Sequence, residues 1–263
     1  MLLRRLLLLV SLFMMSQTAF SDIIETPVTL PDDLGTGVMY LNDKQKKPGP
    51  GVIVIHEWWG LNDYARDRAR MLARAGYTAL AVDMYGTGKA APHPKDAEAL
   101  MKPAMAEPEK MNARFEAARK MMLKQQQVEA GRLFAIGYCF GGGVVLNQAR
   151  MGTDLAGVAS FHGTLGTDTP AQPGDIKARI LAATGQADPM IPAEQVTGFV
   201  TEMTEAGADF QLLSFPGVKH SFTNPKADAV AERFDMPVGY DAHADQVSWK
   251  ALVDFIEHKS HAE

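Results

Sequence analysis

The sequence predicts an α/β fold with a mostly parallel central sheet and helices on both faces. Apolar runs of strand length alternate along the chain with segments whose apolar residues recur at helical spacing. The run at residues 51–55 is continuous and β-branched, which is typical of a strand buried on both faces of a sheet. A glycine-rich turn, Gly-Tyr-Cys-Phe-Gly-Gly at 137–142, joins another such run to a helical segment. These features favour one domain of alternating strands and helices.

The elements can be assigned in order along the chain. We predict antiparallel edge strands before Pro48, including residues 37–41, because the alternating pattern begins only after it. The parallel strands are expected at 51–55, 78–82, 132–136, 157–161, 179–183 and 210–215. Helices are expected from the N-cap Asn62 to Gly76, around 111–122, at 143–150, from Val196 to Gly207, and at 245–258 with Val247, Ala251 and Phe255 facing inward.

The first 21 residues have the composition of a secretory signal peptide. Arg4 and Arg5 are followed by an apolar run at 6–15, and Ala-Phe-Ser at 19–21 offers a cleavage site. The run is too short to span a bilayer comfortably, so we predict cleavage near residue 21 and export to the periplasm or the medium. An uncleaved N-terminal anchor is the alternative. Residues 22–263 would then form the folded domain.

Composition excludes several classes of protein. The formal net charge is −5 and no segment concentrates Lys and Arg, so a nucleic-acid groove is not expected. The sequence has no second long apolar run, so we expect no membrane span after signal removal. Cys139 is the only cysteine, which excludes an intramolecular disulfide and a cysteine-rich metal site. It is a packing residue, an intermolecular link or a reactive thiol; the sequence does not predict an oligomeric state.

Three reactive side chains follow three of the predicted strands. Cys139, Asp188 and His220 each come directly after a strand, where ligands of parallel sheets bind. Their chain order is nucleophile, acid, histidine, which is the order of the α/β-hydrolase pattern. We therefore predict that these three residues meet at one edge of the sheet.

The turn that carries Cys139 suits a nucleophile. A strained strand-to-helix turn needs small neighbours, which accounts for Gly137, Gly141 and Gly142. The N–H of Phe140 at the helix start could bind a developing oxyanion, and a second N–H would come from the loop near Trp58. The helix N-terminus also favours a thiolate over a thiol.

The chain resembles the dienelactone hydrolase (carboxymethylenebutenolidase) family of α/β-hydrolases over residues 36–258. The segments that carry the resemblance are HEWWG (56–60), RARMLARAGYTALAVDMYG (68–86), GYCFGG (137–142), ADP (187–189) and KHSF (219–222). A cysteine at the nucleophile position, with a glutamate after the first long strand, distinguishes this family from serine α/β-hydrolases.

The resemblance implies a role for each matching residue. Cys139 would be the nucleophile, His220 the general base and then acid, and Asp188 the carboxylate that orients His220. Glu57 matches a family glutamate that contacts the cysteine at rest and helps to control its ionisation. Phe140 and Trp58 match the family's backbone oxyanion donors.

One departure from the family concerns the substrate. Members that act on dienelactones hold the substrate carboxylate with arginines, one of them four residues after the catalytic histidine, where this chain has Asn224. In the segment expected to carry the other, this chain has Lys89, His93 and Lys95 and no arginine. The resemblance therefore supports the family's catalytic mechanism for this chain more strongly than it supports the family's substrate.

Other residues near the strand ends are candidates for the substrate pocket: Trp59, Tyr85, His162 and Asn224. Packing is an equal alternative for Trp58 and Trp59, and a structural role is the better interpretation of His162. No histidine pair has metal-ligand spacing with an acid, and no full dinucleotide fingerprint is present, so we expect neither a metal nor a cofactor.

We predict hydrolysis of a lactone or a small activated ester by a Cys-Asp-His triad. A general carboxylesterase or thioesterase of broader range is the alternative within the enzyme class, and Asn224 favours it. Two alternatives come from other classes. A thiol redox protein would need a resolving thiol, which the chain does not supply, and an inactive binding module would be expected to have lost part of the triad.

Overall fold

The structure, a computed structural model, describes residues 22–258 and has eight strands in one sheet within that range. The strand order is β1-β2-β4-β3-β5-β6-β7-β8, and the strands from β4 to β8 are parallel to one another. The strands are β1 (Ile23–Leu30), β2 (Gly35–Asn42), β3 (Gly49–Ile55), β4 (Thr78–Val82), β5 (Val128–Tyr138), β6 (Gly157–Phe161), β7 (Arg179–Gly185) and β8 (Phe210–Phe215). The predicted α/β class is confirmed.

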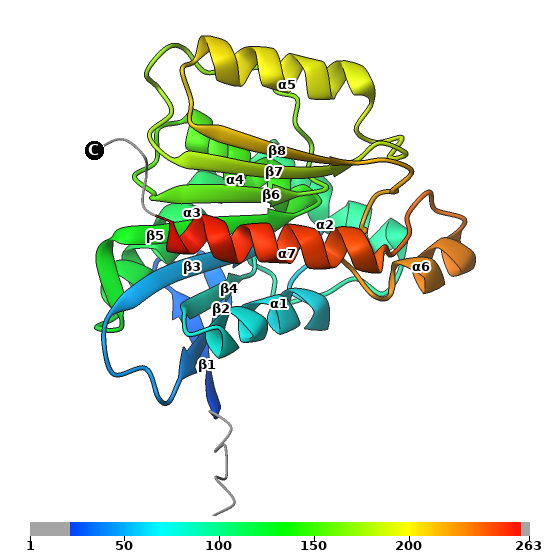
Figure 1. Ribbon diagram of the computed structural model, residues 1–263. Coiled ribbons are helices and arrows are strands. Elements are labelled where there is room, and N and C mark those ends of the chain that lie inside the picture. Colours follow the sequence, from blue (N-terminus) through cyan, green and yellow to red (C-terminus); the bar gives the residue numbers. More distant parts are fainter. Residues whose placement is uncertain (1–21, 259–263) are drawn as a thin grey trace, which may run out of the picture.

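Within residues 22–258 there are seven helices, which pack on both faces of the sheet and beside it (Figure 1). They are α1 (Asp63–Arg74), α2 (Pro94–Ala106), α3 (Pro108–Leu123), α4 (Phe140–Arg150), α5 (Ala193–Glu205), α6 (Ala227–Phe234) and α7 (Ala242–Glu257). Asn62 caps α1 as predicted, because its side chain accepts a hydrogen bond from the Ala65 N–H. None of the helices in residues 22–258 is both long and apolar enough to cross a membrane.

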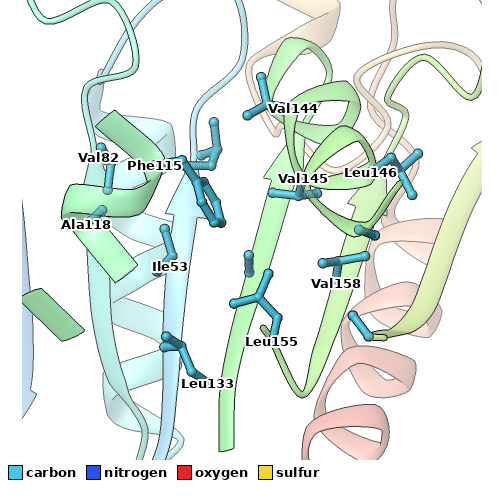
Figure 2. Close-up of a cluster of buried hydrophobic side chains, with 14 of the residues drawn as sticks. Ile53, Val82, Phe115, Ala118, Leu133, Val144, Val145, Leu146, Leu155 and Val158 are labelled. Atoms are coloured by element: carbon cyan, nitrogen blue, oxygen red, sulfur yellow. The ribbon is translucent and has the colours of Figure 1, made fainter. Parts of the chain in front are cut away.

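Alternate residues of the buried strands face two separate cores. On β3, Ile53 and Ile55 belong to the cluster under α3, α4 and α5, whereas Val52 and Val54 belong to the cluster under α1 and α7. Figure 2 shows part of the first cluster, where Phe115 of α3 and Val145 of α4 pack towards Ile53. Burial on both faces explains why the sequence of this strand is continuously apolar.

The amino-terminal edge of the sheet is antiparallel, as expected from its sequence. β2 pairs antiparallel with β4, and β1 pairs antiparallel with β2 along its whole length. The prediction of edge strands before Pro48 is therefore confirmed. The predicted signal peptide at residues 1–21 lies outside the described residues.

The structure differs from the sequence prediction in three helices. α2 and α6 were not predicted, and together with the loop after β3 they enclose a third apolar cluster that contains Trp59 and Ala97. In α7, Val247 is 37% exposed, so its predicted inward position is wrong. Phe255 and Ala251 pack towards the core as predicted, and Leu252 and Ile256 complete the buried face of α7.

Candidate active site

The candidate nucleophile lies at the turn between β5 and α4. Cys139 precedes the first residue of α4 and has φ of 53° and ψ of −114°, a conformation that is strained for a residue with a Cβ. Its N–H donates to the Phe161 carbonyl (3.0 Å), and its own carbonyl accepts from the Gly142 N–H (3.0 Å). These bonds hold the turn in place, and the thiol side chain is half-buried at the wall of a cavity.

Two glycines of this turn are required by close backbone contacts. A Cβ on Gly137 would lie 2.0 Å from the Gly141 carbonyl oxygen, and a Cβ on Gly141 would lie 2.5 Å from the Ile55 carbonyl oxygen. Backbone atoms of β3 and α4 cannot move aside as a flexible side chain could. The glycines therefore allow the nucleophile turn to pack directly against the end of β3.

Asp188 and His220 form a buried pair beside the turn. Asp188 follows β7 and His220 follows β8, and the Nδ1 of His220 lies 2.7 Å from Oδ2 of Asp188. The other oxygen of Asp188 accepts from the Met190 N–H (2.8 Å), which fixes the plane of the carboxylate. The Nε2 of His220 is buried and makes no geometrically good hydrogen bond to another described residue. Cys139 is the neighbour whose charge acts most strongly on the imidazole.

The electrostatics of this group favour an imidazolium at rest. Burial opposes charge on His220, but the negative charge of Cys139 and the hydrogen bond to Asp188 outweigh burial and raise the pKa of His220 to about 10. When Cys139 is ionised, the histidine therefore keeps its second proton at neutral pH. The structure thus brings the predicted thiol, imidazole and carboxylate together in one charged group.

Two backbone N–H groups near Cys139 remain without an acceptor in the described chain. They are those of Phe140, the first residue of α4, and Trp58, in the loop after β3. The Trp58 carbonyl accepts from the Tyr85 hydroxyl (2.9 Å), which holds this loop in place. His56 adds a second tie, because its Nε2 accepts from the Met84 N–H and its Nδ1 then donates to the Glu57 carbonyl (2.5 Å).

Glu57 is buried next to the segment that carries His220. Its carboxyl oxygens accept from the Ser221 hydroxyl (3.0 Å) and the Asn224 side-chain amide (2.8 Å). Burial raises its pKa, although both hydrogen bonds and the positive charges of His220 and Arg68 act in the opposite direction. The family resemblance implied a contact between Glu57 and Cys139; in this structure its hydrogen bonds go to Ser221 and Asn224 instead.

His162 lies behind His220 and not in the cavity, so its assignment to the substrate pocket is wrong. It is fully buried, with a φ of 42°, and its Nε2 lies 2.7 Å from the Thr223 hydroxyl. Its ring meets the His220 ring edge to face, with centroids 5.1 Å apart. Burial and the charge of His220 hold the pKa of His162 well below its usual value, so this ring is neutral.

The sequence did not predict the polar network that supports this region. The Thr223 hydroxyl also forms a hydrogen bond with the Tyr64 hydroxyl (2.5 Å). The backbone carbonyl of Thr223 accepts a hydrogen bond from Arg68, and Arg68 also forms an ion pair with Asp245 (2.7 Å). These residues come from α1, α7 and the loop after β8. No local motif signals such contacts, because the partners are more than 150 positions apart in the sequence.

Cys139 and His220 open on a cavity of about 570 Å³. Of the predicted pocket residues, Trp59 and Asn224 line it, as does Trp58. Tyr85 does not line it, because its hydroxyl is directed to the Trp58 carbonyl and its ring packs against Phe140. Within residues 22–258, no group of three His, Cys, Asp or Glu side chains converges as a set of metal ligands.

Comparison with known proteins identifies the family. The model of the dienelactone hydrolase family matches residues 37–260. The chain belongs to this family. It is 29% identical over 214 residues to protein usf of Aquifex pyrophilus, a match that covers 80% of this chain and 88% of that protein. A probable 2-oxo-3-(5-oxofuran-2-ylidene)propanoate lactonase of Bradyrhizobium is 30% identical over 190 residues, covering 68% of this chain and 76% of that protein.

Solved structures of dienelactone hydrolase-like proteins show the same architecture. A dienelactone hydrolase-like promiscuous phosphotriesterase from metagenomic libraries superposes with a TM-score of 0.79 at 29% identity, over 89% of this chain and 97% of that one. A putative dienelactone hydrolase of Klebsiella pneumoniae, with a TM-score of 0.74 at 20% identity, covers 89% of this chain and 98% of that one and shares the fold. As a member of the dienelactone hydrolase family, the protein is a carboxylic-ester hydrolase that acts on lactones or esters.

Proposed function

We propose that the protein hydrolyses its lactone or ester substrate through a thioester on Cys139, with His220 and Asp188 completing the triad. The observation that supports this most strongly is the geometry of the turn. Cys139 is held in a strained conformation at the cavity wall, beside a histidine whose other nitrogen is bonded to a buried carboxylate. A thiol with only a packing role would need neither the strain nor the charged partner.

In the first step the Cys139 thiolate attacks the substrate carbonyl carbon. The carbonyl π electrons move to oxygen, and the N–H groups of Phe140 and Trp58 bind the resulting oxyanion. When the tetrahedral intermediate collapses, the bond to the leaving alkoxy oxygen breaks. That oxygen takes the proton from Nε2 of His220, which leaves a neutral imidazole and a thioester.

The second step uses the altered charge of the site. Formation of the thioester removes the negative charge of Cys139, which is a main cause of the raised pKa of His220. The pKa of His220 therefore falls, and Nε2 can accept a proton from water as the oxygen attacks the thioester. Expulsion of the thiolate gives the carboxylic acid and restores the pair of Cys139 thiolate and His220 imidazolium.

We further propose that Glu57 controls the ionisation of the site at rest. Its burial raises its pKa, and its hydrogen bonds to Ser221 and Asn224 place the carboxyl beside the segment that carries His220. The Glu57→Gln variant tests this role, because Gln keeps the shape and cannot ionise. The role is contradicted if both the alkylation rate of Cys139 and the turnover rate are unchanged.

The main test is a panel of esters and lactones, with and without a carboxylate, assayed on the wild type and on Cys139→Ala. We expect turnover by the wild type and none above background by the variant. Neutral phosphotriesters belong in the panel, because one solved relative is a promiscuous phosphotriesterase. If the wild type hydrolyses nothing while peroxide oxidises Cys139, the thiol redox alternative replaces the proposal.

We also propose that the protein is exported, on the basis of residues 1–21. Two arginines, an apolar run and a small-residue cleavage site support this proposal. Amino-terminal sequencing of protein from the periplasm or the culture medium should find cleavage near residue 21. Recovery of the full-length chain in the cytoplasm would contradict the proposal.

A further inference from the structure

The cavity beside Cys139 is walled mainly by apolar side chains. Five methionines line it, together with both tryptophans of the loop after β3. The methionines are Met101, Met105, Met111, Met190 and Met236. They come from α2, α3 and the loops beyond β7 and α6, so they surround the space from several sides. Methionine side chains are flexible and adapt to apolar groups of different shape.

The only arginine or lysine of the lining is already neutralised. Arg150 places Nε and one terminal nitrogen 2.8 Å from the two oxygens of Glu202, and that terminal nitrogen also donates to the Leu165 carbonyl (2.7 Å). Burial acts against ionisation of Glu202, but Arg150 and the Ala171 N–H outweigh it and lower its pKa. Arg150 and Glu202 therefore form a buried ion pair with no charge left for a ligand.

The amide side chains of the lining are also occupied by the protein. Gln148 donates to Asn112 (2.8 Å), and Asn224 donates to Glu57 (2.8 Å) while its oxygen accepts from the Lys226 N–H (3.0 Å). The lining hydroxyls of Thr164, Thr167 and Ser221 also have protein partners. Apart from the neutral amides of Asn112 and Asn147, the catalytic pair and the free N–H groups at Phe140 and Trp58 are what is left for a substrate.

A carboxylate on the acyl part of the substrate, away from His220, would therefore lose its water without gaining a cationic partner. The lining contains no lysine, and the buried acids Glu57 and Asp188 are bonded to the lining residues Asn224 and His220. Transfer of an unpaired charge into such surroundings is strongly unfavourable. An uncharged apolar group, in contrast, would gain contact with the methionine-lined walls.

From these contacts we infer that the substrate is an uncharged ester or lactone with an extended apolar acyl part and no free carboxylate. This inference rests on the proposed function, because it concerns the same site. Beyond the proposed function, the inference assigns the cavity to the acyl part of the substrate and excludes anionic substrates.

Two substrate comparisons on the wild type test the inference. The first compares p-nitrophenyl hexanoate with the mono-p-nitrophenyl ester of adipic acid, which differs mainly by a terminal carboxylate. We expect kcat/KM to be at least about 100-fold higher for the hexanoate. The second is a series from acetate to octanoate, in which each added methylene should raise kcat/KM about fourfold until the cavity is full.

A cation placed in the cavity should weaken the selectivity for the neutral ester. Met111→Lys puts an ammonium group at the start of α3, in the lining, and should lower the ratio of neutral to anionic kcat/KM at least tenfold. Leu123→Lys at the exposed end of the same helix is the matched control and should leave the ratio unchanged. Val230→Lys on α6 provides a second lining site if Met111→Lys does not fold.

The outcomes separate this inference from the proposed function. Equal kcat/KM for the hexanoate and the adipate ester, or a flat chain-length series, would overturn the inference while leaving the cysteine mechanism intact. An equal change in ratio for Leu123→Lys and Met111→Lys would also overturn it. If Cys139→Ala hydrolyses the hexanoate as fast as the wild type, the proposed function itself fails.

Discussion

At the scale of single residues, the charge of His220 depends on its two neighbours, Cys139 and Asp188. The pKa of His220 is raised to about 10, above the value of about 6.5 that it would have in the unfolded chain. A raised pKa means that the imidazolium stabilises the fold fully below pH 6.5, and that this contribution is lost as the pH rises through about 10. Stability should therefore decline on the alkaline side.

Replacing Cys139 by Ser tests the origin of this shift. A serine hydroxyl carries no charge in this range, so only Asp188 would still favour the imidazolium against burial. We expect the pKa of His220 to fall by several units in an NMR titration of the histidine ring signals. The exposed His243 serves as the internal control. An unchanged titration of His220 would show that the thiolate does not sustain its charge.

Sequence reasoning predicted the triad because its members follow strands in a recognisable order. It did not predict that Glu57 would bond Ser221 and Asn224, or that His162 would lie behind His220. Those contacts depend on how the loop after β8 folds back over the end of β3. That arrangement follows from tertiary packing and leaves no local pattern in the sequence.

At the scale of elements, the buried strands were predicted best. β4 and β6 have the predicted limits, because a strand buried within a sheet requires a continuous apolar run. β8 also has the predicted limits, although it is a half-buried edge strand. α2 and α6 were missed for the opposite reason. α2 contains Pro103 and buries only Ala97 and Ala104, so its sequence has little helical periodicity.

The turn between β5 and α4 gives a prediction at this scale. Gly137→Ala would place a Cβ 2.0 Å from a backbone oxygen, so we expect a loss of more than about 4 kcal/mol in the free energy of unfolding, or no folded protein. Gly198→Ala in α5 is the control. Its Cβ would meet nothing within 4 Å, and it should gain about 0.5–1 kcal/mol. Denaturant unfolding of both variants measures this; equal stability of the two would refute the packing argument.

At the scale of the whole molecule, an ion pair with a buried arginine joins α1 to α7. Arg68 of α1 is 4% exposed and bonds both Asp245 of α7 and the carbonyl of Thr223, three residues after His220. Its guanidinium also lies over the rings of Tyr64 and Trp249. The position of His220 therefore depends on the docking of helices far from it in sequence.

Removing the partner of this buried charge should be costly. We expect Asp245→Ala to lower the free energy of unfolding by about 3 kcal/mol, since it leaves Arg68 buried without its carboxylate. Asp254→Ala on the same helix breaks the exposed pair with Lys250 and should cost less than about 1 kcal/mol. Thermal and denaturant unfolding would show the contrast. Similar losses for both variants would mean that Arg68 does not organise this region.

The most direct test of the mechanism is to observe the acyl group on Cys139. Rapid quenching during turnover of p-nitrophenyl hexanoate, followed by intact-protein and peptide mass spectrometry, would detect the thioester. We predict a hexanoyl adduct on the peptide that contains Cys139, formed within the first turnover and then hydrolysed. Steady turnover with Cys139 unmodified, or an adduct on Ser221 instead, would contradict the account.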